Sequence, residues 1–395
     1  MIPGALSLGL RVAAALPFLT WLYLLGARGG FWRVERHLPR SRAAAMPAQA
    51  PRTRRVVAIV PARNEADVVG AAVGSLLRQE LASVHVVVID DGSTDGTAEA
   101  ALKAAAAAAA SDRITVVDGA PLQSGWSGKL WAVSQGVAAA TVQYPDYLLL
   151  TDADIEHDPS NVASLVASAE SGGLDLVSSM VRLSTATFAE RCLIPAFVFF
   201  FFKLYPPAWI ASSRARTAGA AGGCMLIRPA ALSRIGGIAA IRSALIDDCA
   251  LAAAVKASGG SVSLGLTRSA RSLRVYGSFA EIGRMIARTA FHQLRHSYGL
   301  LAATLLGLAV TYLMPPLLLL TRDPLTMGLG AAAWALLSLA YWPTLRFYGL
   351  APLWAPALPA IAAFYAGATL WSAVQYSLGR GGWWKGRVQD ARLAG

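Results

Sequence analysis

The chain has little charge for its length. Charged residues make up 15% of its 395 residues, and the mean hydropathy is +0.48. Soluble domains usually carry about 25% charged residues, so this composition indicates a membrane component. Acids are the scarcer sign, because 23 Asp and Glu stand against 35 Lys and Arg, a net charge of +12. Such a surplus suits anionic lipid or a phosphorylated substrate. Nucleic-acid binding is excluded, because the basic residues cluster beside apolar segments and no recognition motif is present.

Cysteine is also scarce. The three cysteines, Cys192, Cys224 and Cys249, show no paired spacing. This excludes a disulfide framework and a cysteine-based zinc site. The pattern fits reduced residues in a cytosolic or membrane-embedded chain.

Residues 1–27 form a predicted transmembrane anchor. The apolar run from Val12 to Leu25 is long enough to span with its flanks. A cleavable signal peptide is the alternative. We favour an uncleaved anchor, because the run leads into a basic juxtamembrane linker, residues 28–55, with eight arginines and one acid. Positive flanks stay in the cytoplasm. We therefore expect an integral protein of the bacterial inner membrane with its following domain in the cytoplasm.

The C-terminal part predicts a helical membrane bundle over residues 299–378. Stretches near 299–320, 328–345 and 353–378 are each apolar and long enough to cross. Three crossings would place the basic tail, residues 379–395, outside, whereas its charges favour the inside. Prolines are frequent in this part, so one segment could be re-entrant, and the sequence leaves the topology open.

Residues 56–270 predict an α/β domain. Apolar strands are expected at 56–62, 84–92, 147–155 and 174–180, with helices at 66–79, 97–110 and 128–140. This alternation is typical of a doubly wound, mostly parallel sheet.

An insertion near 188–210 interrupts the pattern. Its apolar run, residues 192–202, contains four consecutive phenylalanines. Eleven helical residues reach about 17 Å, short of the roughly 30 Å of a bilayer core. We expect this segment to lie in the membrane interface, and a core helix is the alternative.

A second interfacial element is expected over residues 271–298. The spacing of Arg284, Arg288, His292 and Arg295 places them on one stripe of a helix near 280–296. Contact with anionic phospholipid headgroups is one interpretation, and contact with a diphosphate is the other.

Polar residues follow three of the predicted strands. They are Arg63-Asn64-Glu65, Asp90-Asp91 and Asp152-Ala153-Asp154. Ligands of open α/β sheets bind outside the carboxyl ends of the strands, so these groups should converge. Two carboxylates spaced i, i+2 can turn to one cation, and Mg²⁺ or Mn²⁺ suits such oxygen ligands. A solvated turn is the plain alternative for Asp152 and Asp154.

Four motifs give the domain a family resemblance. They are "VVAIVPARNEADVV", "VVVIDDGSTDGT", "LLLTDADI" and "LIDDCAL". In this order they resemble family 2 glycosyltransferases, which have the nucleotide-sugar fold called GT-A. "SGWSGKLWAVSQG" and "RTAFHQLRHS" resemble the narrower group of hopene-associated glycosyltransferases.

The resemblance implies roles for individual residues. Asp248 takes the position of the catalytic base, and Asp154 and Asp152 those of metal ligands for Mg²⁺ or Mn²⁺. Where the family usually has Glu-Asp, this chain has Asp247-Asp248. The implied substrate-binding residues are Pro61, Ala62, Arg63 and Glu65 at the base, Asp91 at the nucleoside, Lys129 at the base or diphosphate, Asp152 at the ribose, Gly222 and Gly223 at the pocket floor, and Asp247 and Arg295.

We therefore expect an inverting, metal-dependent enzyme that transfers one sugar. Polymerising relatives carry Gln-x-x-Arg-Trp at a position where this chain has His292-Gln293-Leu294-Arg295-His296. Because the Trp that would stack on a sugar chain is missing, a processive polymerase is disfavoured. The expected donor is a UDP-sugar and the expected acceptor a membrane lipid such as a hopanoid. The alternatives are a polyprenyl-phosphate glycosyltransferase and a non-catalytic membrane protein that binds nucleotide sugars.

Overall fold

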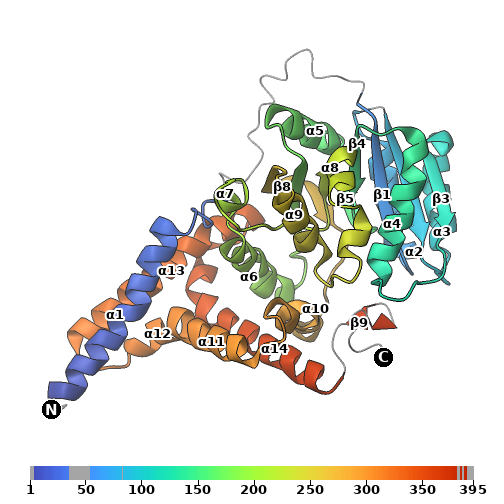
Figure 1. The fold of residues 1–395 in the computed structure, drawn as a ribbon. Coiled ribbons are helices and arrows are strands. Elements are labelled where there is room, and N and C mark those ends of the chain that lie inside the picture. The colour runs from blue at the N-terminus through green and yellow to red at the C-terminus, as the bar shows by residue number, and fades with distance from the viewer. Residues whose placement is uncertain (1–3, 35–53, 82, 380–382, 385–386, 389–395) are drawn as a thin grey trace. The chain divides into compact units, whose positions relative to one another are not determined.

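The computed structural model describes residues 4–34, 54–81, 83–379, 383–384 and 387–388. The chain forms two compact units (Figure 1). Among the described residues, the α/β unit comprises 54–81, 83–184, 209–275, 383–384 and 387–388, and the helical unit comprises 4–34, 185–208 and 276–379. Most of the predicted basic linker and basic tail lies outside the described residues.

The described part of the α/β unit contains an eight-stranded sheet in the order β3-β2-β1-β4-β7-β6-β8-β5. Neighbouring strands are parallel from β3 to β4 and between β6 and β8. β7 is antiparallel to β4 and β6, and β5 is antiparallel to β8. The mostly parallel sheet that we predicted is therefore a mixed one. The strands are β1 Val56–Ala62, β2 Val84–Asp90, β3 Ile114–Asp118, β4 Tyr147–Leu150, β5 Ile155–His157, β6 Leu176–Arg182, β7 Met225–Ile227 and β8 Val262–Ser272.

The third predicted strand, residues 147–155, is wrong in its extent. The chain leaves β4, an inner strand, after Leu150 and turns through Asp152 and Asp154. It then enters β5, the edge strand next to β8. β3 and β5 were missed because five or three residues are too few to show a periodic pattern. β8 was missed because its second half, "TRSARS", is polar.

Three predicted helices of this unit are confirmed as α2 Ala66–Leu77, α3 Thr97–Ala107 and α4 Gly128–Ala140. α4 packs on β1 and β2, and Gly136 lies against Ile59 and Ile89. A Cβ at Gly136 would overlap the Ile59 side chain, so glycine sets the distance between helix and sheet. The other helices of the unit are α5 Asn161–Ser171, α8 Pro229–Arg234 and α9 Asp247–Ala257. α7 Pro207–Ile210 lies where the chain returns to the α/β unit.

The helical unit carries long apolar helices. Among the described residues, five segments are long and apolar enough to cross a membrane: Gly9–Ala27, Phe188–Ile210, Tyr298–Leu318, Pro324–Tyr348 and Pro352–Ser377. They contain α1 Gly4–Ala27, α6 Phe188–Leu204, α11 Tyr298–Leu308, the π-helix η5 Ala309–Leu313, α12 Met314–Leu318, α13 Pro324–Tyr348, η6 Pro352–Ala357 and α14 Leu358–Ser377. Four of these segments match the predicted anchor and bundle.

The fifth corrects the length on which we based our expectation for residues 192–202, whereas their place in the membrane interface stays a prediction. The apolar run is only the middle of α6, which with α7 makes a 23-residue segment, so its length does not prevent it from spanning. α6 also packs on α10 Phe279–Gln293, α13 and α14. Phe199 and Phe202 are 1% and 2% exposed. Phe199 contacts Phe31 and Tyr341, so it belongs to the core of the helical unit.

The predicted basic stripe is shorter than expected. Arg284 and Arg288 are exposed on α10, whereas Ile282, Ile286 and Phe291 are buried. α10 ends at Gln293, and Arg295 follows with a φ of +53°. Arg295 therefore lies beyond the helix and outside the stripe. It also belongs to the helical unit, whereas the other predicted site residues lie in the α/β unit.

Candidate active site

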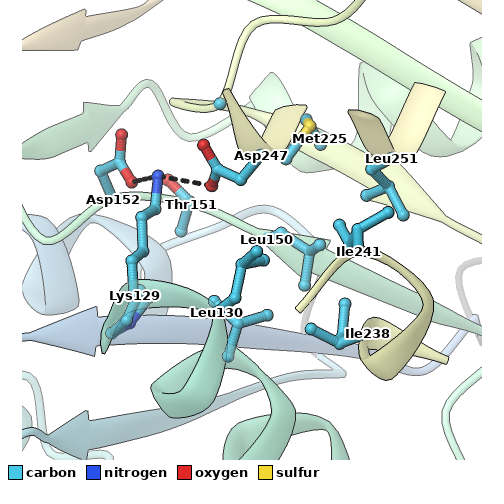
Figure 2. Close-up of a pocket in the computed structure, with 13 residues that line it drawn as sticks. Lys129, Leu130, Leu150, Thr151, Asp152, Met225, Ile238, Ile241, Asp247 and Leu251 are labelled. Atoms are coloured by element: carbon cyan, nitrogen blue, oxygen red, sulfur yellow. Dashed lines mark ion pairs between the residues drawn. The ribbon is translucent and has the colours of Figure 1, made fainter. Parts of the chain in front are cut away.

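Lys129 joins two acidic groups of the α/β unit. It stands in the first turn of α4, which begins after Ser127, whose hydroxyl caps the helix by accepting a bond from Leu130 N. Its Nζ lies 2.8 Å from Asp152 Oδ1 and 3.1 Å from Asp247 Oδ2. Figure 2 shows the lysine side chain reaching between the two carboxylates. The structure thus brings together the end of β4, the start of α4 and the start of α9.

Asp248, the predicted base, is held beside this cluster. Gly222 N donates to its Oδ2 at 2.8 Å, and Cys249 N donates to its Oδ1 at 2.7 Å. Burial raises the pKa of Asp248 to about 6, the Asp247 charge adds to the rise, and Lys129 opposes it. Asp247 and Asp248 do occupy the first turn of a helix, where acids are favoured. Their contacts to Lys129 and Gly222 go beyond that local role.

The lysine keeps its proton. Burial alone would lower the pKa of Lys129, but the charges of Asp152 and Asp247 and the bond to Asp152 raise it overall. Lys129 is therefore a fixed positive charge at the site.

A pocket opens at this cluster. Its polar edge is formed by Lys129, Asp152 and Asp247, and apolar side chains line the other side (Figure 2). The full lining is Pro61, Lys129, Leu130, Val133, Leu150, Thr151, Asp152, Gly222, Met225, Ile238, Ile241, Asp247 and Leu251.

Gly222 lines the pocket, whereas Gly223, also predicted at its floor, is not among the lining residues. A Cβ at Gly222 would lie 3.4 Å from Asp248 Oδ2 and 3.5 Å from Lys129 Nζ. A Cβ at Gly223 would lie 3.3 Å from Val181 and 3.4 Å from Ile155. A Cβ at Gly222 would make ordinary contacts with the charged cluster, whereas a Cβ at Gly223 would press slightly on Val181.

Asp154 has a partner that the sequence did not reveal. Arg274 Nε donates to Asp154 Oδ2 at 2.9 Å, and Arg274 Nη2 donates to Glu65 Oε1 at 3.1 Å. Arg274 follows β8 by two residues, in a stretch with many arginines and no recognisable motif. No local signal distinguished it from Arg268 or Arg271.

The loops after β1 and β2 are joined by hydrogen bonds. Asn64 Oδ1 accepts from Thr94 N at 2.9 Å, and Asn64 N donates to Ser93 Oγ at 3.0 Å. Arg63 Nη1 lies 3.7 Å from Asp91 Oδ2 and also donates to the Asp91 carbonyl. These contacts bring the predicted residues Arg63 and Asp91 together.

Pro61 and Ala62 are the last two residues of β1 rather than part of the loop. Pro61 lines the pocket, whereas the Ala62 side chain is 2% exposed and packs in the core. Its carbonyl accepts from Asp91 N at 2.9 Å, so almost nothing of Ala62 is exposed to a ligand.

Asp152 and Asp154 are the residues predicted to hold a divalent cation. Among the described residues, no group of three or more His, Cys, Asp or Glu side chains could hold a metal. His157 is buried and contacts Thr151 Oγ1 at 3.0 Å and Asn161 Nδ2 at 2.9 Å, so both ring nitrogens have protein partners. Mg²⁺ commonly uses one or two carboxylates and completes its shell with water and substrate phosphates. Asp152 and Asp154 fit that pattern.

Comparisons with known proteins bear on the family and the fold of this chain. Residues 57–236, a little under half of the chain, match the model of the family described as Glycosyl transferase family 2. No curated protein matches the chain.

Among solved structures, the mannosyltransferase PcManGT from Pyrobaculum calidifontis, in complex with GDP-Man and Mn²⁺, has a TM-score of 0.51 at 19% identity. The match covers 94% of this chain and 98% of that chain, and shows a shared fold. S. aureus TarS matches with a TM-score of 0.41, at 17% identity, over 60% of this chain and 40% of that chain. Glucosyl-3-phosphoglycerate synthase from Mycobacterium tuberculosis, with phosphoglyceric acid, has a TM-score of 0.36, at 20% identity, over 59% and 76%. These two scores are too low to support more.

Proposed function

We propose that this protein is a membrane-anchored, inverting glycosyltransferase. It would transfer a single sugar from a nucleotide sugar, with a UDP-sugar as the expected donor, to a hydroxyl group of a lipid. One observation carries the proposal. Asp248 is a partly buried carboxylate that Gly222 N and Cys249 N hold beside the cluster of Lys129, Asp152 and Asp247. A site with one acid suited to proton transfer and two suited to a cation has the parts that this reaction needs.

The reaction would be a single displacement. The acceptor oxygen bonds to the anomeric carbon while Asp248 takes its proton. The bond between that carbon and the diphosphate oxygen breaks, and the leaving nucleoside diphosphate keeps the electron pair. Attack from the opposite face inverts the anomeric centre. Lys129 contributes fixed positive charge, and Mg²⁺ or Mn²⁺ held by Asp152 and Asp154 would supply more to the diphosphate.

A lipid acceptor is supported by the five apolar segments in the same chain. The resemblance to hopene-associated glycosyltransferases suggests a hopanoid alcohol in particular. We place the catalytic unit on the cytoplasmic side, where nucleotide sugars are available, and expect the exposed Arg284 and Arg288 to contact anionic headgroups.

The proposal is tested by incubating membranes that contain the protein with a panel of labelled nucleotide sugars, followed by lipid extraction and mass analysis. The expected product is a neutral lipid carrying one sugar. Labelled polyprenyl phosphate would instead identify a phosphate acceptor, and no labelled lipid with any donor would contradict the proposal.

Asp248→Asn tests the base. The substitution keeps the shape but removes the proton acceptor, so transfer should fall by roughly two to four orders of magnitude. Nucleotide-sugar affinity should hardly change, because the base acts on the acceptor. If affinity collapses while turnover at saturation survives, Asp248 has another role. A phosphate acceptor, which needs little help from a base, should also tolerate the change.

A further inference from the structure

Arg274 bridges two loops of the α/β unit. It pairs with Asp154, in the turn after β4, and with Glu65, in the loop after β1. Its side chain is 41% exposed, whereas each carboxylate is 14% exposed. The arginine therefore covers two acids that are largely shielded from water.

The backbone beside Arg274 is fixed independently of its side chain. Leu273 N donates to the carbonyl of Asp154 at 2.7 Å. The half-exposed guanidinium can therefore change partners while the chain stays attached to the turn. An arginine fork matches phosphate as well as carboxylate, because both present paired oxygens.

A cation that binds Asp154 competes with Arg274 for the same carboxylate. Its arrival would also bring two positive charges beside the guanidinium. The arginine then needs a new anion, and a nucleoside diphosphate bound to that cation would bring one to the same place.

We propose that Arg274 is a positioning residue that exchanges partners. Without nucleotide it neutralises Asp154 and Glu65 and disfavours binding of a divalent cation alone. With nucleotide it moves to the diphosphate, so that cation and nucleotide bind together. This inference rests on the proposed nucleotide-sugar site and adds a residue and a binding order to it.

The test measures binding, using the full chain in detergent. Free Mn²⁺ is followed by electron paramagnetic resonance during titration, with and without UDP, and UDP binding in the presence of Mn²⁺ is measured by calorimetry. Arg274→Gln should bind Mn²⁺ alone about two- to fivefold more tightly, which is the scale of a partly exposed ion pair. The same variant should bind UDP with Mn²⁺ about tenfold more weakly, because a charged bond to phosphate is lost.

Arg271→Gln is the matched control. Arg271, on β8, pairs with Glu156, on β5, at 2.7 Å and not with Asp154 or Glu65, so both affinities should stay at the wild-type values. Arg274→Lys keeps the charge but cannot bridge both acids in the same way. It should bind Mn²⁺ alone more tightly than wild type, by a smaller factor than Arg274→Gln. If Arg274→Gln does not fold, the Mn²⁺ affinity of Arg274→Lys tests the competition in its place.

Opposite signs for the two affinities are the result that supports the exchange. If Arg274→Gln binds Mn²⁺ alone no more tightly than wild type, the competition is overturned. If UDP affinity does not fall, the move to the diphosphate is overturned. Neither measurement uses sugar transfer, so an inactive protein with these binding changes would refute the proposed reaction and leave the role of Arg274 intact.

Discussion

Asp248 shows how two opposing neighbours set the protonation of one carboxylate. Burial and Asp247 raise its pKa to about 6, and Lys129 limits the rise. At neutral pH the group is therefore mostly ionised, yet close enough to its pKa to accept a proton readily.

This pKa predicts the pH dependence of transfer. A base works only when deprotonated, so kcat/KM should fall as the pH drops below about 6 and level off above it. The measurement is kcat/KM for the lipid acceptor against pH, at a saturating concentration of the nucleotide sugar. A rate that rises toward low pH would contradict the assignment of Asp248 as the base.

Lys129→Met extends the prediction. The Lys129 charge lowers the pKa of Asp248, so its removal should move the acid limb of the pH profile to higher pH. The midpoint is compared rather than the absolute rate, because the lysine is also expected to bind the donor. Lys103→Met, on an exposed face of α3, is the control and should leave the midpoint unchanged. An unshifted midpoint in Lys129→Met would separate the lysine from the base.

At the scale of the element, α4 connects a packing feature to the site. Its N-terminal turn carries Lys129, and Gly136, two turns later, lets the helix approach β1. The position of the lysine thus depends on a residue that touches no substrate.

Gly136→Ala tests this dependence. Its new Cβ would overlap Ile59, so the helix must shift, and the free energy of unfolding should fall by roughly 1–3 kcal/mol. Nucleotide affinity should fall as well. Gly70→Ala in α2 is the matched control, because its Cβ would make only ordinary contacts at 3.5 Å or more. Chemical denaturation checks both, and equal stability of the two variants would contradict the packing argument.

α6 gives a second prediction at this scale. Phe199 is buried and contacts Phe31 and Tyr341, whereas Phe201 is partly exposed. Phe199→Ser should therefore destabilise the helical unit by roughly 3–5 kcal/mol, the range for emptying a buried aromatic site. Phe201→Ser should cost clearly less. Thermal unfolding in detergent compares them, and a larger loss for Phe201→Ser would reverse the assignment of the buried side of α6.

At the scale of the whole molecule, the chain combines an enzyme-like α/β unit with a helical unit. Five apolar segments of 19 to 26 residues are enough for several crossings. A peripheral protein held only by charge would lack them.

Extraction of membranes distinguishes these modes of attachment. We expect the protein to stay in the pellet after washes with 1 M salt, which screens charges over about 3 Å, and with alkaline carbonate. Detergent should release it. Release by salt alone would show that its basic residues, rather than its apolar helices, provide the attachment.

The sequence by itself determined the local features. Buried strands, their polar ends, the helix from Gly128 to Ala140 and four of the five apolar segments follow from short-range patterns of side chains. Such patterns hold because period and composition act within one element. The acidic motifs and the basic Lys129 were visible for the same reason.

Only the tertiary structure decided which of these groups meet. Lys129 lies between Asp152 and Asp247, and Arg274 between Asp154 and Glu65, although each partner comes from a different element. These contacts depend on strand order and on where the antiparallel β7 and β5 insert, which no local pattern encodes. The same limit explains why we predicted too short a helix for α6 and placed Arg295 on α10. A helix extends beyond its most apolar run where other helices cover it, and it ends where the chain must turn.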